Sequence, residues 1–363
     1  MNTPPTTVQR LLGYLADDTG NLALRADIFQ AALEGGDFDE AQRQAAWVLG
    51  RDPVSHAWRH RLAMLDIARG ELDEAALLLQ GLIDEGQGDP AIAYNLAYVD
   101  FTRGALEPAA ARLEPLVQAH AAALPQALAL LVRCLHRLGR VGDAVALFRR
   151  QVAADSSANA YGAAALAALD AGEASLAMRW ADRALALDDR QHEAAVTKGT
   201  LLLGPGDVAG AMALLAGARE RHPQDGRTWS AIGTAELMAG RLPAAREALL
   251  RATQLMPDHV GTWQALGWCH VFERDLGAAL AVFEAALARD RNFAESHGSV
   301  AAVLALQGRR EAAEEALRRA QKLDADSLAA RYAQAVLSGE AADPVRFQQL
   351  VSAALAAQRG KLQ

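Results

Sequence analysis

The sequence predicts an all-α protein built as a linear array of helical hairpins, an α-solenoid. Two recurring residues carry this prediction. In nine consecutive windows of about 34 residues, alanine occupies the same place: Ala41, Ala75, Ala109, Ala144, Ala177, Ala211, Ala245, Ala279 and Ala313. Five residues earlier stands glycine in eight windows and Arg274 in the other; the glycines are Gly36, Gly70, Gly104, Gly139, Gly172, Gly206, Gly240 and Gly308. This period is typical of repeats that bury their apolar faces only against their neighbours.

Composition supports helices throughout and bears on the partner. Hydrophobic residues make up 52% of the chain and aromatic residues only 5%, so the interior is mainly Ala and Leu, which favour closely packed helices. The net charge is −8, and lysine occurs only at Lys198, Lys322 and Lys361. Nucleic-acid affinity depends largely on basic residues that neutralise phosphates, so we expect no nucleic-acid partner.

The cysteines, the N-terminal residues and the apolar runs indicate in which compartment we expect the protein. Cys134 and Cys269 both fall at the tenth position of a repeat, where Ala31 and Ala235 also stand, so we expect small buried residues rather than redox or metal chemistry. The N-terminal residues lack a basic segment followed by an apolar stretch. No apolar run reaches 18 residues without charge, so we expect no membrane span and a cytoplasmic protein.

The elements follow in order once the alanine is set at position 20. Residues 1–21 are predicted to form a half-repeat whose helix, at residues 8–16, caps the array. Nine repeats then fill residues 22–327 as one continuous domain, starting at Leu22, His56, Pro90, Pro125, Ala158, His192, Gly226, Val260 and Ala294. Residues 328–363 form a partial repeat, with a first helix at 328–337 and a capping helix at 344–358.

Within each repeat we expect a first helix at positions 2 to 14 and a second ending near position 30. Glycine at position 15 provides the left-handed residue that ends the first helix. Small residues at positions 8 and 20 are expected to face each other where the two helices cross, because larger side chains would separate the backbones.

The two clearest copies carry a recognisable pattern. From Gly226, positions 4, 7, 8, 15, 20, 24, 27 and 32 hold Trp229, Ile232, Gly233, Gly240, Ala245, Leu249, Ala252 and Pro257. From Val260, the matching residues are Trp263, Leu266, Gly267, Ala279, Phe283 and Ala286. This pattern resembles the tetratricopeptide repeat. The resemblance implies a right-handed superhelix and a protein-binding scaffold whose concave groove is lined by first-helix positions 2, 5, 9, 12 and 13.

The chain departs from that pattern at three positions. Position 11 is usually not aromatic. Position 4, normally a large apolar residue, holds Arg25, Arg59 and His297 in three repeats, and position 27 holds Gln151 in the fourth repeat. We therefore expect repeats one, two and four to pack differently in detail while keeping the architecture.

The groove positions of repeats two to four, with the adjoining position 6, predict an aromatic floor flanked by positive charge. The residues are His60, Arg61, Met64, Ile67, Tyr94, Asn95, Tyr98, Phe101, Arg133, His136 and Arg137. Such a surface suits an acidic-aromatic peptide or a terminal carboxylate. A second, apolar cluster in repeat eight consists of Gln264, Trp268, Val271 and Phe272. The alternative for the first cluster is that Tyr94, Tyr98 and Phe101 only fill gaps between adjacent first helices. The alternative for the second cluster is that its side chains pack against the terminal helices.

Some tetratricopeptide domains bind chaperone C-termini through a carboxylate clamp of Lys, Asn and Arg residues. Only Asn95 matches that clamp, because positions 5 and 9 of the preceding repeat are His60 and Met64. The resemblance therefore disfavours this partner class.

No catalytic, metal or cofactor motif is found in the sequence. His56 and His60 are spaced i, i+4, but no third ligand stands at a matching spacing. Residues 204–206, Gly-Pro-Gly, fall at a predicted turn without a preceding strand. We therefore expect no enzyme, no metal and no cofactor, but a scaffold for a protein or peptide.

Two alternatives stay open at this point. The chain could recruit substrates or assist assembly for a larger enzyme, secretion or pilus system. It could also be a structural protein that self-assembles into an oligomer through incompletely capped ends. The alanine and arginine bias suggests a bacterial source.

Overall fold

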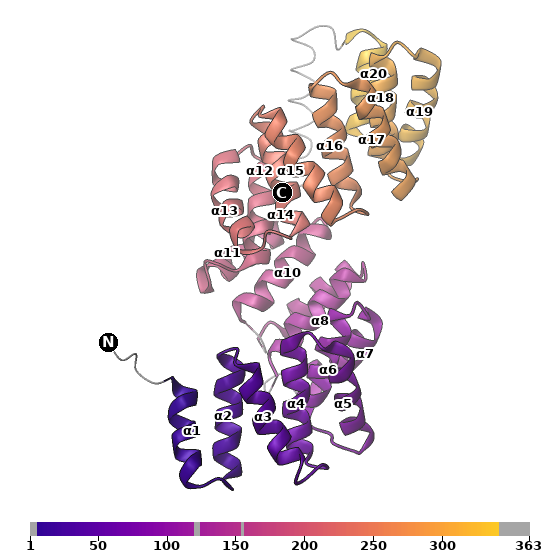
Figure 1. Cartoon of the computed structure of the whole chain (residues 1–363). Helices are drawn as coiled ribbons and strands as arrows, with labels where there is room; N and C mark the ends of the chain where they lie inside the picture. Colours follow the sequence, from indigo (N-terminus) through magenta and orange to yellow (C-terminus); the bar gives the residue numbers. More distant parts are fainter. Residues whose placement is uncertain (1–5, 120–123, 154–155, 341–363) are drawn as a thin grey trace, which may run out of the picture. The chain divides into compact units, whose positions relative to one another are not determined.

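The computed structural model describes residues 6–119, 124–153 and 156–340 (Figure 1). Within these ranges the regular elements are helices α1–α20, and no strand is present. The predicted all-α solenoid class is thus confirmed. The chain divides into two compact units, Met1–Ser156 and Ser157–Gln363, which we call unit 1 and unit 2. No helix in the described ranges is both long and apolar enough to cross a bilayer.

Unit 1 contains a single leading helix followed by consecutive hairpins. Its helices are α1 (Thr7–Asp17), α2 (Leu22–Glu34), α3 (Phe38–Leu49), α4 (His56–Arg69), α5 (Leu72–Asp84), α6 (Pro90–Thr102), α7 (Leu106–Ala119), α8 (Gln126–Arg137) and α9 (Val141–Gln151). Each even-numbered helix packs against the helix that follows it, and each hairpin packs against the next.

Unit 2 repeats the same arrangement, and the last helix of its described residues is α20. Its helices are α10 (Ala158–Asp170), α11 (Ala174–Leu187), α12 (His192–Leu203), α13 (Val208–Arg221), α14 (Gly226–Met238), α15 (Leu242–Leu255), α16 (Val260–Phe272), α17 (Leu276–Arg289), α18 (Ala294–Leu306), α19 (Arg310–Leu323) and α20 (Leu328–Leu337).

The helix boundaries follow the 34-residue period of the sequence. The even-numbered helices α2 to α18 begin at the predicted first residues of the repeats, except α8, which begins one residue later. All nine position-20 alanines have no exposed surface. The position-15 glycines have φ between 72° and 88°, and Arg274, which replaces glycine there, has φ 62°. The turn therefore imposes the left-handed conformation even on a residue with a Cβ.

Position 8 packs differently from our expectation. A Cβ added to Gly233 would lie 2.5 Å from Leu249 Cγ, and one added to Gly267 would lie 2.3 Å from Phe283 Cε1. Leu249 and Phe283 stand at position 24, so position 8 first meets position 24 rather than the alanine at position 20. The small residue makes room for a large apolar one, and the two together fill the crossing.

The predicted helices at the array's ends are partly observed. Helix α1 covers the predicted N-terminal helix, and α20 has the predicted bounds. Helix α18 holds α20 in place, because the Glu295 carboxylate accepts hydrogen bonds from the amides of Leu328 and Ala329, both at 2.9 Å. The predicted capping helix at 344–358 lies outside the described residues.

Candidate functional site

The predicted partner-binding residues of repeats two to four stand on three first helices of unit 1, α4, α6 and α8. We call the surface formed by positions 2, 5, 6, 9, 12 and 13 of these helices the α4–α6–α8 face. It comprises His60 and Arg61 of α4, Tyr94, Asn95, Tyr98 and Phe101 of α6, and Arg133, His136 and Arg137 of α8, with their neighbours. None of these positions holds Asp or Glu.

Tyr98 is the most exposed aromatic residue of this face. Its exposed fraction is 40%, whereas Tyr94 and Phe101 are half-buried. Burial raises the pKa of Tyr94, the neighbouring Tyr98 adds to the rise, and the positive charge of Arg133 opposes it. Tyr94, Tyr98 and Arg133 therefore interact electrostatically across α6 and α8.

Arg137 binds to the helix beside it. Its guanidinium lies 4.8 Å from the centroid of the Phe101 ring and donates a hydrogen bond to the Phe101 carbonyl at 3.4 Å. The side chain itself is exposed. The cation–π contact thus holds a positive charge above the half-buried aromatic ring while leaving it open to solvent.

The polar residues on α4 are paired within the unit. Asn95 Nδ2 lies 2.8 Å from His60 Nε2, which joins α6 to α4. Burial lowers the pKa of His60. Arg61 lies 5.1 Å from the Trp58 ring and donates to the Ala57 carbonyl at 3.3 Å.

The two histidines of α4 do not share a partner. His56 Nε2 lies 3.3 Å from Glu85 Oε2, while His60 contacts Asn95. Glu85 also accepts two hydrogen bonds from Arg59 Nη1, at 2.6 and 2.9 Å. Arg59 stands at position 4, so this departure from the repeat pattern is used for an ion pair with the end of α5.

In the second predicted cluster, on α16 of unit 2, Gln264 and Trp268 contact neighbouring helices. Gln264 is buried, and its amide donates to Ser296 Oγ at 2.6 Å and accepts from Ser299 Oγ at 2.8 Å. Both ends of this side chain therefore join α16 to α18. Gln264 therefore contributes to packing between the adjacent first helices α16 and α18.

Trp268 is enclosed by other rings. It makes edge-to-face contacts with Phe283 of α17 at 5.7 Å and Tyr332 of α20 at 5.6 Å, and a tilted contact with Phe272 at 6.4 Å. Phe272 remains 57% exposed. Of the predicted residues in this cluster, Phe272 presents the accessible apolar surface.

A side-chain bridge on the unit 2 first helices was not foreseen from the sequence. Arg227 of α14 donates two hydrogen bonds to the Asp170 carboxylate of α10, at 2.6 and 3.1 Å. The residues stand two repeats apart, at positions 2 and 13, so no pattern within one repeat indicates the pair. A comparison of charges at these positions across alternate repeats could have found it.

Two separate segments of the chain match a family model of the tetratricopeptide repeat, residues 26–90 and residues 202–269. Among curated proteins, no sequence matches that of this chain. The first segment lies in unit 1 and the second in unit 2. The matches span part of the array, so the number of nine repeats and their outer boundaries stay predictions.

Solved structures with similar folds are also repeat proteins or their complexes. The APC/C hetero-tetramer Cut9-Hcn1 gives a TM-score of 0.59 at 16% identity, covering 83% of this chain and 59% of that one. This chain thus spans about three fifths of that relative. A tetratricopeptide repeat protein from Parabacteroides merdae gives 0.46 at 15% identity, covering 69% of this chain and 97% of its own.

YrrB, described as a TPR protein with an unusual peptide-binding site, gives a TM-score of 0.38 at 23% identity, covering 52% of this chain and 97% of its own. The family-model matches agree with the helix boundaries and left-handed turns of both units. Both units of the chain therefore contain tetratricopeptide repeats.

Proposed function

We propose that this chain is a non-catalytic interaction scaffold that binds an extended, acidic segment of a partner protein on the α4–α6–α8 face. Tetratricopeptide repeat proteins generally mediate protein–protein interactions and assembly. The proposal adds a location and a partner chemistry to that general role. The partner is a protein rather than a nucleic acid, because the chain has a net charge of −8.

The observation that carries the proposal is the exposure of Tyr98 beside two half-buried aromatic residues. A tyrosine ring that is 40% exposed offers apolar area and a hydroxyl at little cost in conformational entropy. Residues of this type dominate binding energy where they lie near the centre of an interface. Tyr98 therefore serves as the anchor, with Tyr94 and Phe101 forming the surface around it.

Charge favours an acidic segment. Arg133 and Arg137 stand on this face, and positions 2, 5, 6, 9, 12 and 13 of its three helices hold no Asp or Glu. Arginine recognises carboxylates through two parallel hydrogen bonds, and unlike charges also steer the encounter. Aromatic contacts then supply affinity and the arginines supply orientation.

The thiols of the chain support a non-catalytic role. Cys134 and Cys269 are both buried. Burial raises the pKa of both thiols, that of Cys134 to about 11. A thiol acts as a nucleophile in its ionised form, so these two residues suit packing rather than covalent catalysis.

The test compares variants in binding to a partner recovered with the full chain and then purified. Tyr98→Ala combined with Arg133→Ala is expected to weaken binding at least tenfold, because the anchor and a neighbouring charge are lost together. Circular dichroism should stay native, since Tyr98 is largely exposed. Met238→Ala is the matched control, because Met238 is a 48% exposed first-helix residue of unit 2. Undiminished binding by the double variant would refute the proposed face.

A further inference from the structure

In two repeats of unit 2, a tryptophan at position 4 joins the first helix to the segment before it. Trp229 Nε1 donates to the Pro223 carbonyl at 2.9 Å, and Trp263 Nε1 donates to the Pro257 carbonyl at 2.8 Å. Both acceptors stand at position 32 of the preceding repeat. The indole therefore occupies a recurring place beside the connection between two hairpins.

Side chains of the second helices cover these indoles. The guanidinium of Arg219, at position 28 of the preceding repeat, lies 5.8 Å from the centroid of Trp229. The guanidinium of Arg289, at position 30 of the repeat that contains Trp263, lies 3.9 Å from the centroid of the Trp263 ring. Position 28 of the preceding repeat thus covers Trp229, and position 30 of its own repeat covers Trp263.

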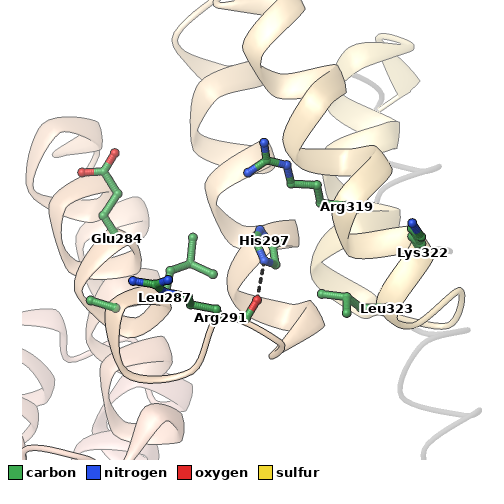
Figure 2. Close-up of a pocket in the computed structure, with 8 residues that line it drawn as sticks. Glu284, Leu287, Arg291, His297, Arg319, Lys322 and Leu323 are labelled. Atoms are coloured by element: carbon green, nitrogen blue, oxygen red, sulfur yellow. Dashed lines mark hydrogen bonds between the residues drawn. The ribbon is translucent and has the colours of Figure 1, made fainter.

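The next repeat keeps the hydrogen bond but replaces the indole. His297 stands at position 4, and its Nε2 lies 2.9 Å from the Arg291 carbonyl, which is again position 32 (Figure 2). An imidazole is smaller than an indole. A cavity of about 670 Å³ opens at this place, and the residues lining it are Glu284, Leu287, Ala288, Arg291, His297, Arg319, Lys322 and Leu323.

Leu287 stands at position 28 of the preceding repeat, as Arg219 does beside Trp229, and Leu323 stands at position 30 of the repeat that contains His297, as Arg289 does beside Trp263. Beside His297 both of these positions hold leucine. In Figure 2, His297 lies between α17, which carries Leu287, and α19, which carries Leu323.

The cavity combines an apolar interior with a basic rim. Leu323 is 45% exposed, which is a large fraction for a leucine on a helix. Arg291, Arg319 and Lys322 stand around it, against one carboxylate, Glu284. Arg319 forms an ion pair with Glu315 at 2.6 Å. Both side chains are exposed, so this pair contributes little to stability and does not prevent Arg319 from binding another carboxylate.

We propose that this cavity binds an aromatic side chain carried by an acidic segment of a partner protein. The aromatic ring takes the place that an indole fills in the two preceding repeats, lying on Leu287 and Leu323. The flanking carboxylates of the segment pair with Arg291, Arg319 and Lys322. The volume falls in the range of about 300–1,000 Å³ that is usual for ligand pockets.

This site is separate from the α4–α6–α8 face. Apart from His297 and Arg291, its lining residues come from the second helices α17 and α19. It also lies in unit 2, whereas the α4–α6–α8 face lies in unit 1. Either site can therefore fail its test without affecting the other.

The test uses a fluorescein-labelled peptide, Asp-Asp-Glu-Phe-Glu-Asp-Asp, titrated with the full chain and followed by fluorescence anisotropy. We expect saturable binding by the wild-type chain. Replacing Phe by Ala in the peptide should weaken binding at least tenfold. No saturable binding of the Phe peptide up to about 1 mM chain would overturn the proposal, because that corresponds to a negligible affinity.

His297→Trp restores the residue that neighbouring repeats use and fills the cavity from within. This variant should keep the circular dichroism spectrum and melting temperature of the wild type, because an indole is accommodated at the same position twice already. It should weaken peptide binding at least tenfold. Wild-type binding by a folded His297→Trp chain would show that the peptide binds elsewhere and would overturn the proposal.

Charge variants test the rim. Arg319→Ala with Lys322→Ala should weaken binding at least fivefold, and the effect should shrink in high salt. The matched control, Arg309→Ala with Arg318→Ala, removes two exposed positive charges from the same region outside the cavity and should change binding less than twofold. Equal loss in both double variants would mean non-specific attraction. Self-association of the wild-type chain that His297→Trp abolishes would assign the cavity to a second copy and also contradict the proposal.

Discussion

The first helices of the two units use the same repeat position in opposite ways. Position 5 holds His60 and Tyr94 in unit 1, but glycine at Gly162 and Gly298 in unit 2. In unit 2, α10 packs closely on α12 and α18 on α20, where glycine stands at position 5, whereas α4 and α6 of unit 1 contact each other at only a few residues, as α14 and α16 and also α16 and α18 of unit 2 do. Glycine at position 5 is therefore found where adjacent first helices pack closely, and a larger residue where they do not.

The glycines show how close the unit 2 helices are. A Cβ at Gly298 would lie 2.5 Å from the backbone nitrogen of Ala330, and one at Gly162 would lie 2.2 Å from Gln191 Oε1. The bonds from Gln264 to Ser296 and Ser299 close this face further. The comparison teaches that a hairpin repeat can keep its turns and alanines while its first helices either pack closely on their neighbours or leave side chains exposed.

The largest expected contrast is between the aromatic residues of the two faces. Trp268→Ala should lower the free energy of unfolding by about 3 kcal/mol, because it removes contacts with Phe283 and Tyr332. Tyr98→Ala should cost less than about 1 kcal/mol, since Tyr98 is 40% exposed. Urea unfolding followed by circular dichroism measures both. Equal losses would remove the distinction between a packed and an accessible face.

The units should also differ in their response to acid. Burial, reinforced by Glu71 and only partly opposed by Arg69, raises the pKa of Asp66 in unit 1 to about 6. The folded state then binds this proton more tightly than the unfolded state, so stability should rise as pH falls from about 7 to about 4. Asp66→Asn should stabilise the chain by about 2 kcal/mol at pH 7 and much less at pH 4.

In unit 2 the pKa of Asp225 shifts in the opposite direction, so its effect of pH on stability also has the opposite sign. Burial alone would raise the pKa of Asp225, but hydrogen bonds from His192 and Thr228 lower it to about 2. The stability it contributes is present above pH 4 and is lost as pH falls toward 2. Thermal melts of the wild type, Asp66→Asn and Asp225→Asn between pH 2 and 7 separate the two effects. Parallel pH profiles for the two variants would contradict these assignments.

Close helix packing in unit 2 predicts a smaller effect from adding one methyl group. Gly298→Ala should destabilise the chain by about 1–2 kcal/mol, because the backbone of α20 must move away. Gly13→Ala is the matched control in α1 of unit 1, where an added Cβ meets nothing within 4 Å. That control should leave stability unchanged or raise it, because alanine favours helix. If both variants melt alike, the helices of unit 2 are not closely packed at this point.

The smallest effect concerns the turn that both units share. Arg274→Gly should raise stability by about 0.5–1 kcal/mol, because glycine adopts a φ of 62° without a Cβ clash. Gly240→Ala, at φ 72°, should lower stability by a similar amount. Differential scanning calorimetry resolves shifts of this size. A destabilised Arg274→Gly chain would indicate that the arginine makes contacts that outweigh its backbone strain.

Much of the fold could be predicted because two repeat positions, each held by one residue type, determine the helix crossings and the turns. The position-20 alanines and position-15 glycines specify buried crossings and left-handed turns, and the structure has both. The partner of position 8 could not be predicted, because position 20 and position 24 both face the first helix. That choice depends on side-chain size at Leu249 and Phe283, which only packing resolves.

The candidate sites were predicted less completely. Sequence position indicates that Tyr98 and Gln264 both stand on first-helix faces, yet it does not indicate which side chain finds partners on the next helix. Gln264 is buried in hydrogen bonds with Ser296 and Ser299, whereas Tyr98 is 40% exposed. The Arg227–Asp170 bridge joins residues 57 apart in sequence and depends on the rotation between repeats. His297 was recognised as a departure, but the cavity beside it depends on leucines from two different helices.

The central proposal is that the α4–α6–α8 face of unit 1 serves recognition, whereas Gln264 and Trp268 on the first helix α16 of unit 2 serve packing. Binding of one purified partner to two variants tests this directly: Tyr98→Ala with Arg133→Ala in unit 1, and Phe272→Ala in unit 2. We predict at least a tenfold loss for the first and less than a twofold change for the second. The reverse result, with Phe272→Ala abolishing binding and the unit 1 variant binding normally, would contradict the account.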